Sequence, residues 1–226
     1  MPLAQLAVFW VLFGVLFGVR PRTATGEQAY AIFLFVGLLP WTYFATALTG
    51  GATSIVANAA IVKKVRLPME LLPASAVLSA MVNFLLSLAV LFVVLAALGP
   101  RHPQGLIYLP ALVAVQTLMS VGLAYLLAAL NVFYRDVQHI LSVLLMAWYF
   151  LTPVLFPVSI VSDPEQAALL HVNPMTGVIV GYQRVLLDGL APEWGSLAWP
   201  LAFGGVMFAL GYRYFQRAQW SFEEWL

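Results

Sequence analysis

The sequence contains no cysteine and very little charge. None of its 226 residues is cysteine, and aspartate, glutamate, lysine and arginine together make up only 8%. The missing thiols exclude disulfides, thiol nucleophiles and cysteine-ligated metal or iron–sulfur sites. A formal net charge of +1 argues against nucleic acid as a partner, because such surfaces need clustered lysine and arginine against phosphates.

Motifs for nucleotide binding and hydrolysis are also missing. The chain has no G-x-x-x-x-G-K-[ST] phosphate loop, no H-E-x-x-H zinc motif and no G-x-S-x-G nucleophile turn. His102, His139 and His171 fall in separate predicted loops, so we expect no shared metal site. We therefore expect no catalytic residue, no metal and no cofactor bound by this chain.

Apolar residues, in contrast, are abundant. They make up 63% of the chain, more than a soluble domain of this size can bury, which predicts a membrane protein. A helical span needs about 20 apolar residues, and strand-type alternation is absent from the long apolar runs. The expected fold is an all-α integral membrane protein forming one transmembrane domain over 1–226. Its six expected spans are 3–19, 29–50, 74–98, 106–130, 140–156 and 197–215.

The first apolar run has a second interpretation, a secretory signal peptide, because it is short and N-terminal. The starting residues MPLAQ carry no basic side chain, and no small-x-small cleavage site comes after the run. These missing features favour a membrane span over a signal peptide.

The distribution of lysine and arginine over the short loops predicts the orientation. One side of the membrane receives Lys63, Lys64, Arg66, Arg135, Arg213 and Arg217, and the other receives Arg20, Arg22, Arg101 and Arg184. The basic cluster at 63–66 decides between the two directions. We expect the loop at 57–73 and both termini in the cytoplasm.

The expected spans hold no ionisable residue well inside them. Ion-driven carriers usually keep ionisable groups at that depth, so a secondary transporter is disfavoured and energy must come from another chain. The neutral polar groups at depth are best interpreted as interhelical hydrogen-bonding residues. They are Gln5, Asn83, Ser87, Gln116, Thr117, Ser120, Ser142 and Thr152.

A charged, proline-marked insert, ANAAIVKKVRLPMELLP at 57–73, separates two spans. Pro68 and Pro73 bracket a predicted short helix at 69–72, because proline is tolerated near a helix start. Composition alone does not distinguish between two interpretations of this insert. One is a basic loop on lipid headgroups. The other is a coupling helix that docks on a cytoplasmic ATPase through the apolar anchors Leu67, Met69 and Leu71.

The segment 157–193 is too long for a bare connector and too mixed to cross the membrane. In HVNPMTGVIVGYQRVLLDG, Asn173 is the expected N-cap, Pro174 the first helical residue and Gly189 the stop. Its length is typical of a short interfacial or re-entrant helix. The preceding SDPEQAALL, capped by Ser162 or Asp163, predicts a second short helix. The two helices could form a gate at the outer mouth. In the alternative interpretation, their residues only cap a helix and lie at the membrane interface.

Five segments spread over the chain resemble the permease subunits of ABC-2 type exporters. The order and spacing are most similar to exporters of O-antigen, capsular polysaccharide or teichoic acid. The segments are GLLPWTYFATAL (37–48), NAAIVKKVRLPMELLPAS (58–75), NVFYRDV (131–137), YFLTPVLFPVS (149–159) and NPMTGVIVGYQRVLL (173–187).

This resemblance implies a pair of six-span permeases in the bacterial cytoplasmic (inner) membrane, with two ABC ATPase subunits beneath that use ATP and magnesium. It implies a lipid-linked polysaccharide as the substrate, a coupling helix in the insert and two outer gate helices between the fifth and sixth spans. Family members usually begin with a cytoplasmic amphipathic helix, whereas this chain starts almost inside its first span. We expect a truncated or misassigned start, or ATPase docking without that helix.

The resemblance and the residue chemistry together give three sets of candidate site residues. Expected ATPase-coupling residues are Asn58, Lys63, Lys64, Arg66, Leu67, Pro68, Met69, Glu70, Arg135 and Asp136, the last also capping the fifth span. The expected glycan path is Trp41, Tyr43, Phe44, Tyr149 and Phe150, whose ring faces can stack on sugars, with helix packing as the alternative. Expected outer-gate residues are Asn173, Pro174, Tyr182 and Arg184.

Two alternative functions remain. An ABC-2 exporter of drugs or lipids would share the same architecture. A membrane-embedded glycan-modifying enzyme or scaffold would work without ATP coupling, but the enzyme would need an ionisable cluster at a membrane face, and we find none convincing.

Overall fold

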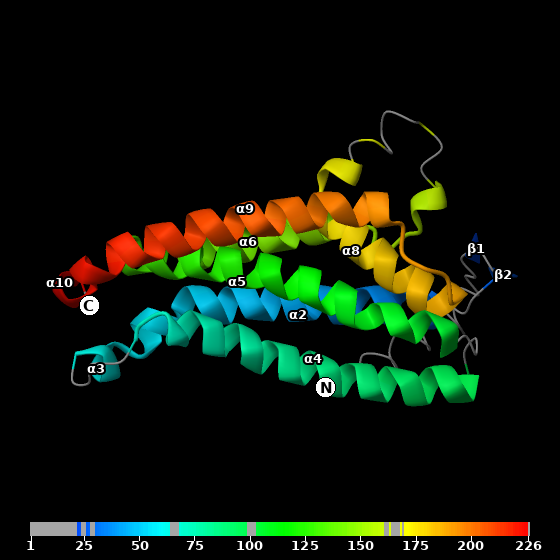
Figure 1. Ribbon diagram of the computed structural model, residues 1–226, viewed down its shortest axis with the longest axis horizontal. Helices are drawn as coiled ribbons and strands as arrows, with labels where there is room; N and C mark the ends of the chain where they lie inside the picture. The colour runs from blue at the N-terminus through cyan, green and yellow to red at the C-terminus, as the bar shows by residue number, and fades with distance from the viewer. Residues whose placement is uncertain are drawn as a thin grey trace. The chain divides into compact units, whose positions relative to one another are not determined.

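The computed structural model describes residues 22–23, 26–27, 30–63, 68–98, 103–160, 163, 168 and 170–225. Most of these residues are helical (Figure 1). The two described strands, β1 (Arg22–Thr23) and β2 (Gly26–Glu27), form a small antiparallel hairpin. The described part of the chain therefore fits the expected all-α membrane fold, while the expected span at 3–19 lies outside it.

Among the described residues, four helical segments are long and apolar enough to cross a membrane. Their helices are α2 (Tyr30–Ala57), α4 (Leu71–Leu98), α5 (Leu109–Phe133), which continues from the 3-10 turn η2 (Pro103–Tyr108), and α9 (Trp194–Ala218). They coincide with the spans expected at 29–50, 74–98, 106–130 and 197–215, with ends that differ by a few residues.

The fifth expected span, 140–156, is wrong in its limits. Helix α6 (Val137–Phe150) has 14 residues, fewer than the roughly 20 that a straight crossing requires. It ends before Pro153 because proline lacks the amide hydrogen that the next turn needs and disfavours helical backbone at the residue before it. The early start also places His139 inside α6 rather than in a loop.

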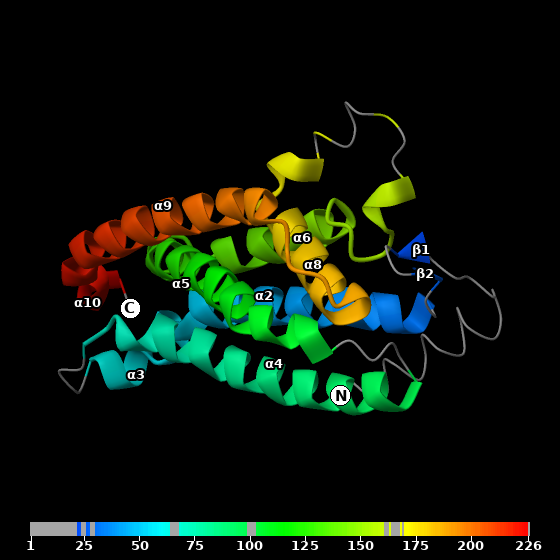
Figure 2. The same ribbon diagram turned by 45° about the vertical axis from the view of Figure 1, so that its right-hand side comes forward.

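Short helical pieces connect the long helices. Helix α3 (Ala59–Val62) stands apart between the end of α2 and the start of α4 (Figure 2). Helix α8 (Pro174–Gln183) runs directly into the π-helical turn η4 (Arg184–Asp188). The remaining pieces are η3 (Val158–Ile160), η5 (Gln219–Ser221) and α10 (Phe222–Trp225).

The helices contribute to two compact units. The first comprises 1–42, 84–113 and 149–199, and the second comprises 43–83, 114–148 and 200–226. The boundaries fall within α2, α4, α5, α6 and α9, so each of these helices supplies residues to both units.

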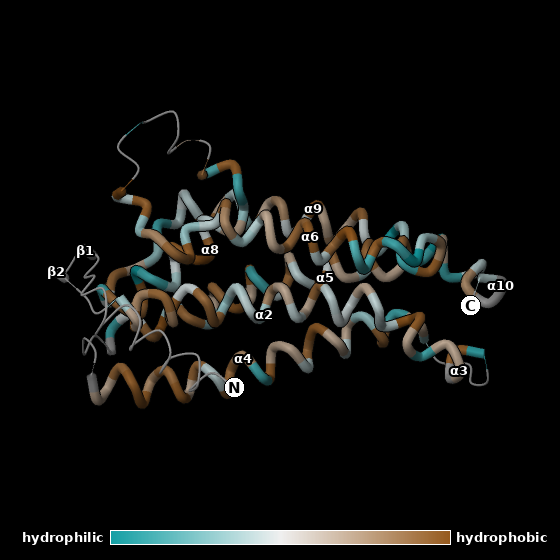
Figure 3. The backbone as a smooth tube through the Cα atoms, turned by 180° about the vertical axis from the view of Figure 1, so that it is seen from behind, coloured by the Kyte–Doolittle hydropathy of each residue, from teal (hydrophilic) through white to brown (hydrophobic). Residues whose placement is uncertain are grey.

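Helix α4 presents a strongly apolar face outward. Most of its residues are hydrophobic by the hydropathy colouring of the backbone tube (Figure 3). Apolar side chains exposed on it include Leu78, Val82, Leu85, Leu86 and Val93. Such exposure is costly in water but is normal against lipid tails or another membrane helix.

The core of the second unit is built on aromatic rings and small residues. Tyr125 lies 5.4 Å from Phe215 and Phe215 lies 5.5 Å from Phe222, measured between ring centroids. A Cβ built on Gly122 would lie 2.4 Å from the backbone nitrogen of Phe208. Glycine is therefore required where α5 and α9 touch, as at many close contacts between membrane helices.

Candidate functional site

The helix expected at the outer mouth begins and ends as predicted. The Asn173 side-chain oxygen accepts a hydrogen bond from the Met175 amide at 2.9 Å, and Pro174 is the first helical residue. Gly189 ends the π-helical turn with a φ of 66°, a left-handed conformation that favours glycine. The predicted cap, proline and stop are therefore confirmed.

The Asn173 side chain also ties this helix to the turn after α6. Its amide nitrogen donates to Thr152 Oγ1 at 2.9 Å and to the Leu151 carbonyl at 3.2 Å. Further along α8, Gln183 Nε2 donates to the Pro153 carbonyl at 3.0 Å. Two side-chain amides thus fix α8 against residues 151–153.

Helix α8 is buried along most of its length. Tyr182 is fully buried and its ring meets Phe84 edge-on, with centroids 5.8 Å apart. A Cβ on Gly181 would lie 2.7 Å from the side chain of Leu112 in α5, so α8 and α5 approach closely there. Helix α8 therefore packs inside this chain and exposes little surface.

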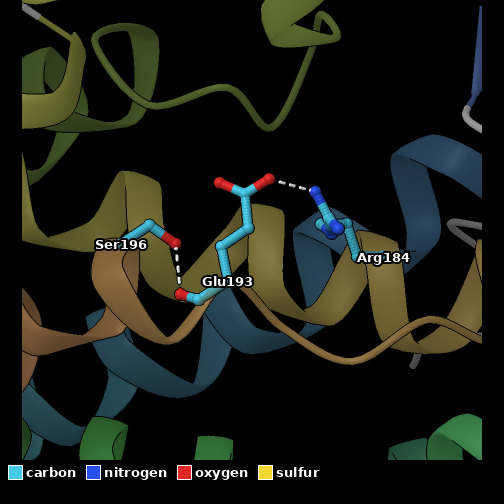
Figure 4. Close-up of polar contacts among 3 residues, drawn as sticks. All are labelled: Arg184, Glu193 and Ser196. Atoms are coloured by element: carbon cyan, nitrogen blue, oxygen red, sulfur yellow. Dashed lines mark hydrogen bonds and ion pairs between the residues drawn. The ribbon is translucent and has the colours of Figure 1, made fainter.

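Arg184 forms an ion pair with Glu193, which the sequence did not single out. Arg184 Nη1 donates to Glu193 Oε1 across the turn at Gly189 (Figure 4). Glu193 precedes α9, and its carbonyl accepts from Ser196 Oγ at 2.8 Å. The side chains are 32% and 60% exposed, so the pair orients the turn more than it stabilises the fold.

Replacing Asn173 by alanine should lower the free energy of unfolding by about 1–2 kcal/mol, because the helix loses its cap. Asn173→Asp keeps the accepting oxygen but loses both donated bonds, so its stability should fall between alanine and wild type. Thermal unfolding of the detergent-purified protein measures the series. Equal stability of Asn173→Ala and wild type would show that the cap is dispensable.

The insert before α4 differs from its prediction. Residues 69–72 are not a separate helix, because the Leu71 amide bonds to the Pro68 carbonyl at 3.0 Å and α4 starts at Leu71. Pro73 lies in the first turn of α4, where the hydrogen bond that proline lacks is not needed. Proline at this place therefore begins a long helix instead of ending a short one.

Two of the predicted docking residues face the chain's own core. Met69 packs against the cluster that contains Phe215 and Phe222. Glu70 Oε2 accepts a hydrogen bond from Gln216 Nε2 of α9 at 2.8 Å. Neither contact could be read from the sequence, since 146 residues separate Glu70 from Gln216.

Other predicted coupling residues face outward. Leu71 is 57% exposed, and Pro68 and Lys63 are exposed beside it in sequence. Asn58 donates to the Ser54 carbonyl at 2.8 Å and directly precedes α3. Lys64, Arg66 and Leu67 lie outside the described residues.

The turn between α5 and α6 carries the other two coupling residues. Arg135 and Asp136 are exposed, and the Asp136 carbonyl accepts from the Ile140 amide at 3.0 Å. Asp136 therefore occupies the predicted position directly before α6.

The aromatic residues expected to line a glycan path pack in pairs between α2 and α6. In the first unit Trp41 lies 5.6 Å from Tyr149, and Tyr149 lies 5.4 Å from Phe150. Trp41 is 6% exposed, Tyr149 is half-buried and Phe150 is 56% exposed. The outermost ring, Phe150, is therefore the most accessible of this set.

A second aromatic pair lies in the second unit. The buried Phe44 ring meets Trp148 edge-on at 5.2 Å. Tyr43, also buried, has its hydroxyl 2.9 Å from Thr117 Oγ1. These contacts give Tyr43 and Phe44 a packing role in the helices of this chain.

Sequence reasoning missed one hollow in the second unit, between α2 and α6. It encloses about 310 Å³ and is lined by Thr49, Thr53, Gln138, His139, Leu141 and Ser142. Within the described ranges, no three His, Cys, Asp or Glu side chains gather closely enough to hold a metal ion. The hollow is thus lined by hydroxyl, amide and imidazole groups set in a larger apolar surface.

Comparison with known proteins gives a consistent result. A family model described as ABC-2 type transporter matches residues 1–187. The chain is 39% identical over 165 residues to the O-antigen export system permease protein RfbA of Myxococcus xanthus, covering 73% of this chain and 64% of that protein. It thus spans just under two thirds of that relative. Two proteins of the same name from Klebsiella pneumoniae are 27% and 29% identical, each over 86% of this chain and 75% of the relative.

Proposed function

Because this chain belongs to the ABC-2 type transporter family, we propose that it is the permease subunit of an ABC exporter that moves a lipid-linked polysaccharide across the bacterial cytoplasmic membrane. The observation that carries this proposal is the likeness to permeases named for O-antigen export, over 73–86% of the chain. Four helices long enough to span the membrane support the same assignment.

The energy for transport is supplied by a separate subunit. The chain lacks a phosphate loop and carries no ionisable group deep in its expected spans. In our proposal two copies of the chain assemble with two ABC ATPase subunits, which bind ATP and magnesium. The insert at 57–73 and both termini face the cytoplasm, where the ATPases reside.

The insert is suited to pass movement from the ATPase into the helices. Leu71 offers an exposed apolar contact on one side. On the other side Met69 packs against the core and Glu70 bonds to Gln216. A displacement of the insert would therefore pull directly on α4 and on the end of α9, with Arg135 and Asp136 as further contacts for the ATPase.

The glycan path runs along the aromatic face shared by α2 and α6, with Phe150 as its accessible ring. The residues 173–189, including Tyr182 and the Arg184–Glu193 pair, act as the outer gate in this proposal. The Asn173 cap and the burial of α8 support this role, because they hold α8 in one defined position in the chain.

Phe150→Ala tests the path with little cost to folding, because this ring is 56% exposed. Glycan export should fall about two- to tenfold, since a stacking contact contributes about 0.5–1.5 kcal/mol. The matched control is Leu151→Ala, since Leu151 is 64% exposed and adjacent but has no ring. Export is measured as surface polymer at equal permease abundance, and equal export by both variants would remove Phe150 from the path.

Deletion of the gene tests the proposed function. Lipid-linked polymer should accumulate inside the cell while polymer at the surface disappears. A glycan-modifying enzyme would instead leave polymer at the surface with altered composition, and an exporter of drugs or lipids would leave it unchanged. A neighbouring gene for a P-loop ATPase is the inexpensive supporting observation.

A further inference from the structure

The pocket of the second unit carries two short stripes of polar side chains, one on each of two facing helices. Thr49 and Thr53 are four residues apart on α2, and Gln138 and Ser142 are four apart on α6. Residues four apart lie one above the other on a helix, so each pair presents its polar groups in one direction. Leu141, 6% exposed, and the carbon atoms of the other side chains make most of the lining apolar.

Each hydroxyl group of this pocket already donates its hydrogen bond to a backbone carbonyl of its own helix. Thr49 donates to the Ala45 carbonyl at 2.9 Å, Thr53 to the Thr49 carbonyl at 3.0 Å and Ser142 to the Gln138 carbonyl at 2.9 Å. A hydroxyl has one donor and two acceptor lone pairs. The lining hydroxyls therefore present acceptors to any ligand.

The remaining polar groups complete a neutral site. Gln138 Nε2 lies 3.4 Å from His139 Nε2, so the amide and the imidazole are close neighbours in the lining. The six lining residues include no lysine or arginine, the side chains that most often hold phosphates.

We propose that this pocket binds a neutral sugar unit of the transported glycan through the sugar's hydroxyl groups. Sugar hydroxyls supply the donors that the threonine and serine oxygens lack, whereas a phosphate supplies none. A volume of about 310 Å³ lies at the lower end of the range for small-molecule sites.

The pocket lies on the same two helices as the aromatic pair of its unit. Thr49 is five residues from Phe44 on α2, and Ser142 is six residues from Trp148 on α6. At 1.5 Å per helical residue these separations are about 7–9 Å, roughly the length of a sugar unit or two. A glycan bound in the pocket would thus be next to the rings of the same two helices. This inference rests on the proposed function.

Binding of a neutral tetrasaccharide, maltotetraose, to the full chain in lipid nanodiscs tests the proposal by saturation-transfer NMR. The double variant Thr49→Val and Thr53→Val keeps the side-chain shape but removes two acceptors. Its dissociation constant should rise about tenfold, because two hydrogen bonds to the sugar are lost. Thr49→Ser with Thr53→Ser should bind like wild type. Thr46→Val should too, because Thr46 is exposed on α2 outside the lining.

Three results would overturn the pocket proposal. They are a wild-type protein without a tetrasaccharide signal, unchanged binding by the double valine variant, and displacement of the sugar by equimolar inorganic pyrophosphate, which would mark an anionic headgroup site. Deletion of the gene separates this failure from failure of the function. If polymer still reaches the surface after the gene is deleted, the proposed function is wrong. If deletion stops export but the double valine variant binds the sugar as wild type does, only the pocket proposal is wrong.

Discussion

Valine in place of Gly211 is expected to prevent α5 and α9 from packing and to leave little folded protein. A Cβ at Gly211 would lie 2.2 Å from the Gly122 carbonyl oxygen and 3.2 Å from the Leu126 amide nitrogen. Both neighbours are backbone atoms, which cannot rotate away as a side chain could. Overpacking of this kind costs about 3 kcal/mol or more, a large part of the stability of a domain.

Gly205→Val is the matched control for Gly211→Val. It lies on the same helix and has the same change in backbone propensity, but a Cβ there has nothing within 4 Å. Size-exclusion profiles and thermal unfolding of detergent-extracted protein compare the variants. Similar folded yields and unfolding temperatures for both would mean that the α5 and α9 backbones are not in contact at Gly211.

Glutamate in place of Leu71 is expected to abolish ATPase binding and glycan export while leaving the fold intact. Leu71 is 57% exposed, so its replacement disturbs little packing. If its side chain enters an apolar pocket on the ATPase, a charge there loses at least about 2 kcal/mol, or roughly thirtyfold in affinity.

Two comparison variants make the Leu71 result specific. Leu71→Met keeps an apolar side chain and should retain co-purification with the ATPase subunit. Met69→Glu, in contrast, should lower stability itself, because Met69 packs against the core cluster. Co-purification of Leu71→Glu at the wild-type level would contradict docking through this face of the insert.

Local rules predicted the parts of the fold that depend on neighbouring residues. Asn173, Pro174 and Gly189 predicted the ends of the helical segment at 174–188, because cap, first-turn proline and left-handed glycine each act within a few residues. The same rules gave the wrong result at Pro73. A proline in the first turn fits the start of a long helix as well as the end of a short one, and only the structure of the residues beyond it distinguishes the two cases.

Contacts between distant segments could not be predicted. The Glu70–Gln216 bond and the threonine stripe facing Gln138 and Ser142 join residues far apart in the sequence. Their spacing shows which face of each helix is polar, but not which helix lies opposite. The burial of Trp41 and Phe44 depends on α6 in the same way.

Translocation into inverted membrane vesicles tests the central claim most directly. Vesicles that carry this chain and its ATPase subunit are supplied with lipid-linked glycan on their outer, cytoplasmic face, and protection from an added glycosidase is monitored with and without ATP. We expect protection to develop only when ATP, the ATPase and this chain are all present. Equal protection in vesicles lacking this chain would contradict its role as the export permease.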